Sequence, residues 1–303
     1  MCGSFTHPQR RIMVFGALVV AGALGGPSTS EAQQSSVQCQ PAATLQRVAE
    51  LPEGSGLAAS RRTPGRFWSH NDSGGPVLVA LDGTGRVVGR LTISGAAVED
   101  WEAVAVGPCP SGSCIHVADI GDNDAERRRI TVYRIVEPVE ASGSAKVADV
   151  LHATYPDGAH DAETLLVTPE GRLFIVTKGD TGPVSLYRFP NELRSGATLA
   201  LERVGEARDP GPPAKNDRIT DGAVSLDGHW IVLRTTQALT FYRAADLLAG
   251  DWREAGRVAL GTLGEPQGEG VTFGSNDSLY LMSEGGGRKQ PGAFARIACT
   301  LGR

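Results

Sequence analysis

The chain has 303 residues and a formal net charge of −5 at pH 7. Its 29 Lys and Arg residues are outnumbered by 34 Asp and Glu residues, so the mildly acidic composition argues against nucleic acid and anionic membranes as partners. The length is sufficient for one large domain with a substantial core.

The first 32 residues carry the pattern of a signal peptide. Arg10 and Arg11 precede an apolar stretch of 13 residues, 12–24, which is too short to span a bilayer. Small side chains around Ala32 place the cleavage site after that residue. We therefore expect a protein exported to the periplasm or the extracellular space, with one domain over residues 33–303 and no membrane span.

A repeat runs through the rest of the chain. Apolar segments that end in arginine recur with steps of 54, 55 and 53 residues, at Arg134, Arg188, Arg243 and Arg296. An apolar stretch without the arginine, residues 76–82, lies one step earlier. Five copies of this length fill most of the chain after residue 32.

Each copy is expected to fold as four short strands separated by Gly, Pro and Asp turns. In the third copy the strands are predicted at residues 163–167, 172–178, 184–189 and 198–206. The first two contain apolar runs, which suit strands buried on both faces, and the fourth is mixed, as an outer strand is. Helical patterns are confined to residues 191–196 and 244–250. Four antiparallel strands repeated around an axis predict an all-β fold, a β-propeller with five blades.

An N-terminal segment is expected to close the ring. Residues 44–50 have a pattern close to that of a predicted fourth strand, and the last copy runs out of chain after its third strand. In this antiparallel pairing Cys39 and Cys299 come together, which predicts a disulfide across the closure. Cys109 and Cys114 share one turn and are expected to form a second disulfide. No Cys-x-x-Cys pair is present, so a zinc site is disfavoured.

Acidic residues recur at the start of the first strand and the end of the second strand of the copies. In a propeller these two places lie at the same mouth of the central channel. Three glutamates that precede or begin first strands are candidate metal ligands: Glu102, Glu163 and Glu269. The other candidate ligand residues of this rim are Asp72, Asp100, Asp119, Lys178, Asp221, Arg234 and Glu284. His160 and Asp161, just ahead of one first strand, are candidate proton-transfer groups.

Several carboxylates around a narrow channel repel one another unless cations offset them. Oxygen ligands without clustered Cys or His favour Ca²⁺, which the three glutamates would bind. Lys178 and Arg234 are the alternative source of positive charge, with no metal at all. For some acids a further alternative is turn chemistry, in which they accept hydrogen bonds from backbone N–H groups. Trp101, between two acids, could equally line a pocket or belong to the core.

Seven short segments also occur in a specific order: HNDSG (70–74), DWEAVAVGP (100–108), DIGDN (119–123), YPDG (155–158), DAE (161–163), TDGA (220–223) and PQGE (266–269). In this set the chain resembles secreted bacterial β-propeller proteins that are grouped loosely with TolB-like or NHL-like propellers. The resemblance covers nearly the whole chain after residue 32 and implies export. TolB-like propellers are generally six-bladed, so six blades is the alternative to five. The resemblance implies little about function, because the group is largely uncharacterised.

Two functions remain open from the sequence. The first is a non-catalytic module that presents the acidic rim to a small ligand, peptide, protein or glycan, and the lack of a recognisable acid–base spacing favours it. The second is a Ca²⁺-assisted hydrolase of a small lactone, phosphoester or similar ester. In that case Glu102, Glu163 and Glu269 hold the metal, and His160 or Asp161 acts as base. No G-x-S-x-G motif is present, which disfavours a serine nucleophile.

Overall fold

The computed structural model of the chain describes residues 1–4, 37–40, 44–207, 211–275, 278–287 and 289–302. The chain divides into two units, Met1–Gln34 and Ser35–Arg303. In the first unit only residues 1–4 are described, so the expected signal peptide and its cleavage site lie outside the described residues. The described strands all belong to the second unit.

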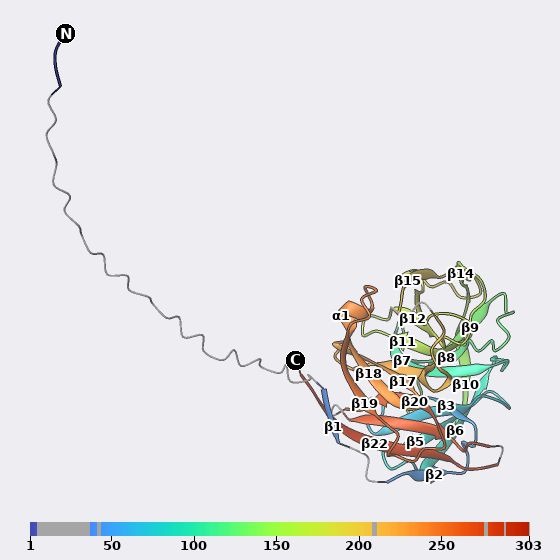
Figure 1. Ribbon diagram of the computed structural model, residues 1–303. Helices are drawn as coiled ribbons and strands as arrows, with labels where there is room; N and C mark the ends of the chain where they lie inside the picture. Colours follow the sequence, from blue (N-terminus) through green and yellow to red (C-terminus); the bar gives the residue numbers. More distant parts are fainter. Residues whose placement is uncertain (5–36, 41–43, 208–210, 276–277, 288, 303) are drawn as a thin grey trace. The chain divides into compact units, whose positions relative to one another are not determined.

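The second unit consists mainly of antiparallel strands that follow the chain in groups (Figure 1). The first group is β3 (Gly54–Ala59), β4 (Arg66–Asn71), β5 (Val77–Asp82) and β6 (Val87–Ser94). The second is β7 (Trp101–Cys109), β8 (Gly112–Asp119), β9 (Ile130–Val136) and β10 (Gly143–Thr154). The third is β11 (Ala162–Val167), β12 (Leu173–Thr177), β13 (Ser185–Arg188) and β15 (Glu202–Glu206). The fourth is β16 (Ile219–Val224), β17 (Trp230–Thr235), β18 (Ala238–Arg243) and β19 (Glu254–Ala259). The last is β20 (Gln267–Phe273), β21 (Leu279–Glu284) and β22 (Gly292–Leu301), completed by β1 (Val37–Gln40) and β2 (Gln46–Val48).

The first strands of these groups form a closed ring. β3 contacts β7, β7 contacts β11, β11 contacts β16, β16 contacts β20, and β20 contacts β3 again. This radial arrangement of antiparallel groups is the β-propeller architecture. Hydrogen bonds join the described strands into four sheets, because parallel pairing of β6 with β10 fuses two groups into one nine-stranded sheet. Since groups and sheets do not correspond one to one, the number of blades stays a prediction.

Side-chain burial follows the position of a strand within its group. β11 and β12 are buried at every residue, as their apolar runs predicted. β19 alternates between exposed and partly buried positions, as an outer strand does. The apolar cores lie between neighbouring groups, where Val132 of β9 shares one cluster with Leu165 of β11. Trp101 is fully buried and its Nε1 donates to a backbone carbonyl at 2.8 Å, so it belongs to the core.

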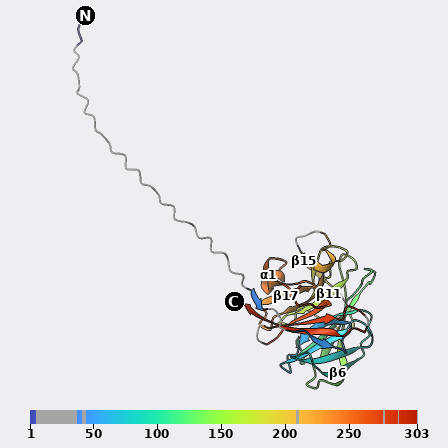
Figure 2. The same cartoon turned by 60° about the horizontal axis from the view of Figure 1, so that its bottom comes forward.

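An N-terminal segment closes the ring. β2 pairs with β22 in antiparallel register, with Val48 opposite Gly292. β1 pairs farther along β22, where Cys39 lies opposite Cys299 and is joined to it by a disulfide. Figures 1 and 2 show the blue strand β1 beside the red strand β22. The predicted closing strand and its disulfide are confirmed.

The prediction of one outer strand at residues 198–206 is wrong in one respect, because the segment forms two strands. β14 (Thr198–Ala200) pairs in parallel with β10 of the neighbouring group, and β15 pairs with β13 of its own group. Leu199 and Leu201 both lie in the core between these groups. Their burial holds the start of the segment against β10 before the chain reaches β13.

The helix predicted at residues 191–196 is also wrong. The segment forms a bend and a turn, closed by a hydrogen bond of 3.2 Å from the Ala197 N–H to the Arg194 carbonyl. Gly196, with a φ of 78°, ends any helical path there. The helix predicted at residues 244–250 is a single turn, α1 (Ala244–Leu247).

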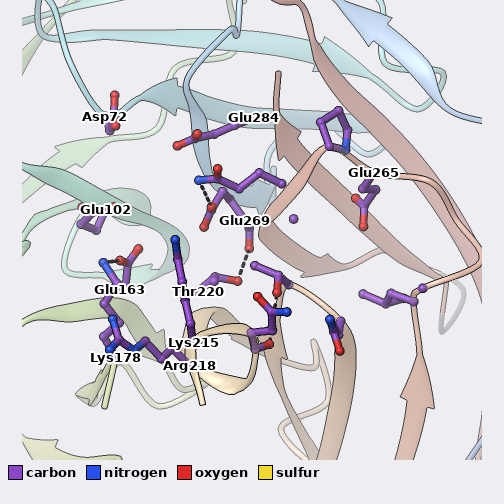
Figure 3. Close-up of a pocket in the computed structure, with 18 of the residues that line it drawn as sticks. Asp72, Glu102, Glu163, Lys178, Lys215, Arg218, Thr220, Glu265, Glu269 and Glu284 are labelled. Carbon is purple, nitrogen blue, oxygen red and sulfur yellow. Dashed lines mark hydrogen bonds and ion pairs between the residues drawn. The ribbon is translucent and has the colours of Figure 1, made fainter. Parts of the chain in front are cut away.

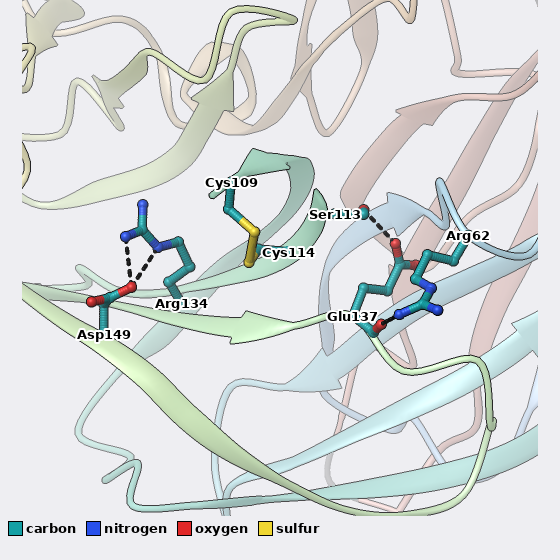
Figure 4. Close-up of a disulfide and its surroundings, with 7 residues drawn as sticks. All are labelled: Arg62, Cys109, Ser113, Cys114, Arg134, Glu137 and Asp149. Atoms are coloured by element: carbon teal, nitrogen blue, oxygen red, sulfur yellow. Dashed lines mark hydrogen bonds and ion pairs between the residues drawn. A yellow bond between two sulfur atoms is a disulfide. The ribbon is translucent and has the colours of Figure 1, made fainter. Parts of the chain in front are cut away.

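The second disulfide, Cys109–Cys114, joins the end of β7 to the first part of β8 (Figure 4). Near it, the buried Glu137 links two groups of strands. Its carboxylate accepts hydrogen bonds from Trp68 Nε1 at 3.1 Å and from Ser113 Oγ at 2.6 Å, which offset its loss of water. The two disulfides suggest an oxidising compartment. Among the described residues, no helix has the length and apolar character needed to cross a membrane.

Candidate functional site

A cavity of about 700 Å³ opens at one end of the ring of first strands (Figure 3). Its walls are the starts of first strands, the ends of second strands, and the loops that precede β16 and β20. The predicted rim residues that line it are Asp72, Asp100, Glu102, Glu163, Lys178, Glu269 and Glu284. The structure therefore brings together seven of the residues singled out from the sequence.

The acids reach the cavity because each first strand is irregular near its start. In all five first strands the register against the second strand shifts at this place, as it does between Trp101 and Ala103. The residues passed over by the ladder include Ser55, Glu102, Glu163, Thr220 and Glu269. A β-bulge of this kind releases one side chain from the strict alternation of a strand and re-aims it. All of these bulge residues except Ser55 line the cavity.

Hydrogen bonds between neighbouring first strands, and one within β20, hold the bulges in place. Ser55 Oγ donates to the Glu102 carbonyl at 3.0 Å and lies 3.3 Å from Glu102 Oε2. Thr220 Oγ1 donates to the Glu269 carbonyl at 3.2 Å. Gln267 Nε2 donates to Glu269 Oε1 at 2.8 Å. The glutamate carboxyls are therefore positioned by the ring itself rather than by mobile surface groups.

One lysine neutralises part of this carboxyl array. Lys178 Nζ lies 3.0 Å from Asp161 Oδ2 and also contacts Glu163 Oε1. Burial alone would lower the pKa of Lys178, but Glu163 and Asp161 outweigh it and hold that pKa above its usual value. Burial, and then the charge of Glu163, raise the pKa of Glu102 well above its usual range. Burial also raises the pKa of Glu163, and the charge of Lys178 opposes that rise.

The other acids of the cavity are perturbed in the same direction. Burial, and then the charge of Glu163, raise the pKa of Glu269 well above its usual range. Burial and then Asp72 raise the pKa of Glu284 to about 7. Burial and then Glu53 raise the pKa of Asp72 to about 6. Near neutral pH the cavity therefore contains both protonated and ionised carboxyls, and its charge changes with pH.

Four predicted rim residues lie buried behind the cavity wall: Asp119, Asp161, Asp221 and Arg234. Asp119 accepts hydrogen bonds from the Glu99 and Asp100 N–H groups at 2.9 and 3.1 Å. Asp221 accepts one from the Val271 N–H at 2.8 Å. These carboxylates bind the backbone, which corresponds to the turn-chemistry alternative.

Arg234 is fully buried and pairs with a glutamate that the sequence analysis did not single out. Its guanidinium lies 2.6 Å from Glu265 Oε2 and donates to the Gly270 and Met282 carbonyls at 2.6 and 3.1 Å. Glu265 lines the cavity. Lys178 therefore pairs with Glu163, one of the three predicted metal ligands, whereas Arg234 pairs with Glu265 instead, and the metal-free alternative stays a prediction.

Two further basic residues of the lining, Lys215 and Arg218, were missed by sequence reasoning. Lys215 begins a short 3₁₀ helix, Lys215–Asp217, in the loop before β16. That loop is rich in Pro and charge, and nothing in its pattern says that it folds over the channel mouth. The sequence did offer one signal that this loop could reach the channel mouth. The loop directly precedes a first strand, and the neighbouring first strands carry acids at the same place.

His160 does not line the cavity. Its Nε2 lies 3.0 Å from Asp157 Oδ1 and 2.9 Å from the Tyr187 hydroxyl. Its ring packs edge-on against Tyr155, with centroids 5.0 Å apart. A proton-transfer role for His160 or for the buried Asp161 stays a prediction.

In the described part of the chain, no group of three or more His, Cys, Asp or Glu side chains is arranged to hold a metal ion. Glu102, Glu163 and Glu269 line one cavity, but Glu163 already contacts Lys178. Calcium binding by the three glutamates stays a prediction.

Comparison with families and with curated proteins gives no match to the chain. Among solved structures, the PQQ-bound aldose sugar dehydrogenase of Streptomyces coelicolor is 13% identical with a TM-score of 0.49, over 87% of this chain and 98% of that one. A gluconolactonase of Xanthomonas campestris is 14% identical with a TM-score of 0.43, over 81% and 72%. A virginiamycin B lyase of Staphylococcus aureus is 11% identical with a TM-score of 0.40, over 81% and 67%. These similarities carry no argument about function, and membership of the TolB-like or NHL-like group stays a prediction.

Proposed function

We propose that this β-propeller binds a small, positively charged ligand in the cavity at its channel mouth. The observation that carries the proposal is the convergence on one cavity of six acids besides Glu265, which Arg234 neutralises: Asp72, Asp100, Glu102, Glu163, Glu269 and Glu284. Among the described residues, Lys178 is the one basic group in ion-pair contact with any of the six. The volume of about 700 Å³ is in the range of small-molecule sites. The cavity thus combines room for a ligand with a large excess of acid.

A bound cation would replace protons in this cavity. Burial and mutual repulsion favour the protonated carboxyls, whereas a cation favours the ionised ones. Binding should therefore tighten as pH rises through the pKa values of about 6 for Asp72 and about 7 for Glu284. At lower pH protons compete with the ligand.

Calorimetric titration with methylamine, putrescine and Ca²⁺ at pH 5.5 and pH 8 tests the proposal. We expect at least one of these cations to bind about tenfold more tightly at pH 8, with release of protons. Glu269→Gln should weaken that binding by roughly tenfold. Glu192→Gln changes an exposed acid outside the cavity and is the matched control. If none of the three cations binds the folded protein at pH 8, the proposal is wrong.

The second candidate function is Ca²⁺-assisted hydrolysis of a small lactone, phosphoester or similar ester. Glu102 and Glu163 favour it, because both carboxyls line the cavity and Glu163 contacts Lys178, and two carboxyls in different surroundings can act as acid and base. Glu102, Glu163 and Glu269 would hold Ca²⁺, which would polarise the substrate oxygen. A panel of lactones and phosphoesters, with Ca²⁺ and with chelator, tests this function. Rates no higher than those of a Glu102→Gln, Glu163→Gln double variant would exclude it.

We also propose that the protein works in the periplasm or the extracellular space after removal of residues 1–32. The disulfides Cys39–Cys299 and Cys109–Cys114 support an oxidising location. N-terminal sequencing of protein from the periplasm or the culture medium should begin at Gln33. Recovery of the full chain from the cytoplasm alone would contradict export.

A further inference from the structure

The cavity presents cations as well as acids, and from a different part of the chain. Most of the acids come from the bulged first strands and the ends of second strands, whereas Lys215 and Arg218 come from the loop before β16. In the view of Figure 3, Asp72 and Glu284 lie at the upper edge of the cavity and Arg218 at the lower edge, while the side chain of Lys215 rises from the lower part of the view toward the acids. The cavity therefore offers opposite charges to the two ends of a ligand.

Within the part of the chain that the structure describes, no carboxylate neutralises Lys215 or Arg218. Among the described residues neither side chain has an ion-pair partner, and the Nε of Arg218 is buried without a hydrogen-bond acceptor. A buried donor without an acceptor is costly, while a charge-assisted hydrogen bond to a carboxylate is strong. The unmatched guanidinium N–H points to an anionic group on the ligand.

Glu265 provides an unmatched atom of the opposite kind. Its side chain is 4% exposed, and its Oε2 accepts a hydrogen bond from Arg234 at 2.6 Å. Its Oε1 is buried without a donor, although the residue lines the cavity. An N–H group of a ligand amine would satisfy this oxygen.

We propose that the ligand is a small amino-carboxylate, such as an amino acid or a short peptide. Its ammonium group would face the acids, and its carboxylate would face Lys215 and Arg218. The inference rests on the proposed function and narrows its ligand from any small cation to one class. A carboxylate fits better than a phosphate, because acids outnumber bases in the lining and would repel a second negative charge. A carboxylate also matches the planar fork of a guanidinium.

A matched ligand series tests the inference. Binding of ω-amino acids from glycine to 6-aminohexanoate is compared with binding of alkylamines of the same chain length, by calorimetry at pH 8. We expect one length at which the amino-carboxylate binds about tenfold more tightly than its alkylamine. Arg218→Gln should remove this advantage and should not weaken binding of the alkylamine, because the change takes a positive charge out of the cavity. Arg194→Gln changes a highly exposed arginine outside the cavity and should alter neither affinity.

Other outcomes separate this inference from the proposed function. Equal affinity for amino-carboxylates and alkylamines at every length would overturn the inference and leave cation binding intact. Tighter binding of phosphoethanolamine than of amino-carboxylates would overturn it as well. If the Arg218→Gln variant binds neither amino-carboxylates nor alkylamines, the Arg218→Lys variant decides. A preference of this variant for amino-carboxylates supports the inference, and the absence of that preference overturns it. If the wild type binds neither amines, Ca²⁺ nor amino-carboxylates, the proposed function itself fails.

Discussion

Replacing Lys178 with methionine removes the cation at the centre of the acid cluster. Lys178 Nζ lies 3.0 Å from Asp161 Oδ2 and contacts Glu163 Oε1. The side chains of Asp161 and Glu163 are 0% and 6% exposed, so water cannot take the place of the ammonium group. Methionine keeps most of the volume of the lysine stem, and the variant therefore isolates the loss of charge.

The expected loss of stability follows from this burial. Removing one partner of a buried ion pair costs about 3–5 kcal/mol of unfolding free energy. The Lys178 side chain is 20% exposed, so solvent screens part of the interaction and we expect about 3 kcal/mol at neutral pH. For a domain of this size that loss lowers the melting temperature by about 6–12 °C.

The loss should also depend on pH. Burial raises the pKa of Glu163 and Lys178 opposes that rise, so the pKa climbs further in the variant. Between the ordinary value of 4.5 and the raised value, the native state binds more protons than the unfolded state. The stability linked to this proton is present at low pH and is lost as pH rises, by about 1.4 kcal/mol per pH unit. The variant should therefore be closer to the wild type at pH 5 than at pH 8.

Urea unfolding of both proteins at pH 5 and pH 8 checks this prediction. Lys215→Met is the matched control, because it removes a cation of the same cavity that has no ion-pair partner among the described residues. It should change the unfolding free energy by less than about 0.5 kcal/mol. An effect of Lys178→Met that is equal at the two pH values, or below about 1 kcal/mol at pH 8, would refute the ion-pair argument.

Other substitutions probe the ring closure, a buried histidine and a cavity glycine. Cys39→Ser opens a bridge with a sequence separation of 260 and should lower the unfolding free energy by about 5 kcal/mol, against about 2 kcal/mol for Cys109→Ser, whose bridge has a separation of 5. Equal losses in urea unfolding would contradict the closure. Burial and then a nearby arginine lower the pKa of His116 to about 3. The wild type should therefore lose stability as pH falls from 6.5 toward that value, and His116→Gln should lose less. If the melting temperatures of the two proteins fall equally over this pH range, the prediction is wrong. Gly121→Ala should weaken cation binding in calorimetry because its Cβ would lie 2.3 Å from a cavity carboxylate oxygen, whereas Gly75→Ala, with no atom within 4 Å, should not.

The sequence was sufficient for the arrangement of strands, because that arrangement depends on local patterns. Each arginine of the repeat lies in the third strand of its group: Arg134 in β9, Arg188 in β13, Arg243 in β18 and Arg296 in β22. Antiparallel pairing of the N-terminal segment with β22 then brings Cys39 to Cys299. Local patterns failed at residues 198–206, where packing against a neighbouring group, rather than alternation along the strand, divides the segment.

The sequence by itself also determined that acids from several repeats meet at one channel mouth, since chain direction alone places the starts of first strands together. Only the tertiary structure decided which of them face the cavity. The bulges turn Glu102 and Glu163 into it, while Asp161 and Asp221, one or two positions from a bulge residue, are buried in the wall. Strand side chains alternate with a period of two, so a bulge of one residue reverses the face of everything beyond it. The presence of Lys215 and Arg218 in the cavity depends on how the loop before β16 packs over the channel, and no local pattern in the chain encodes that packing.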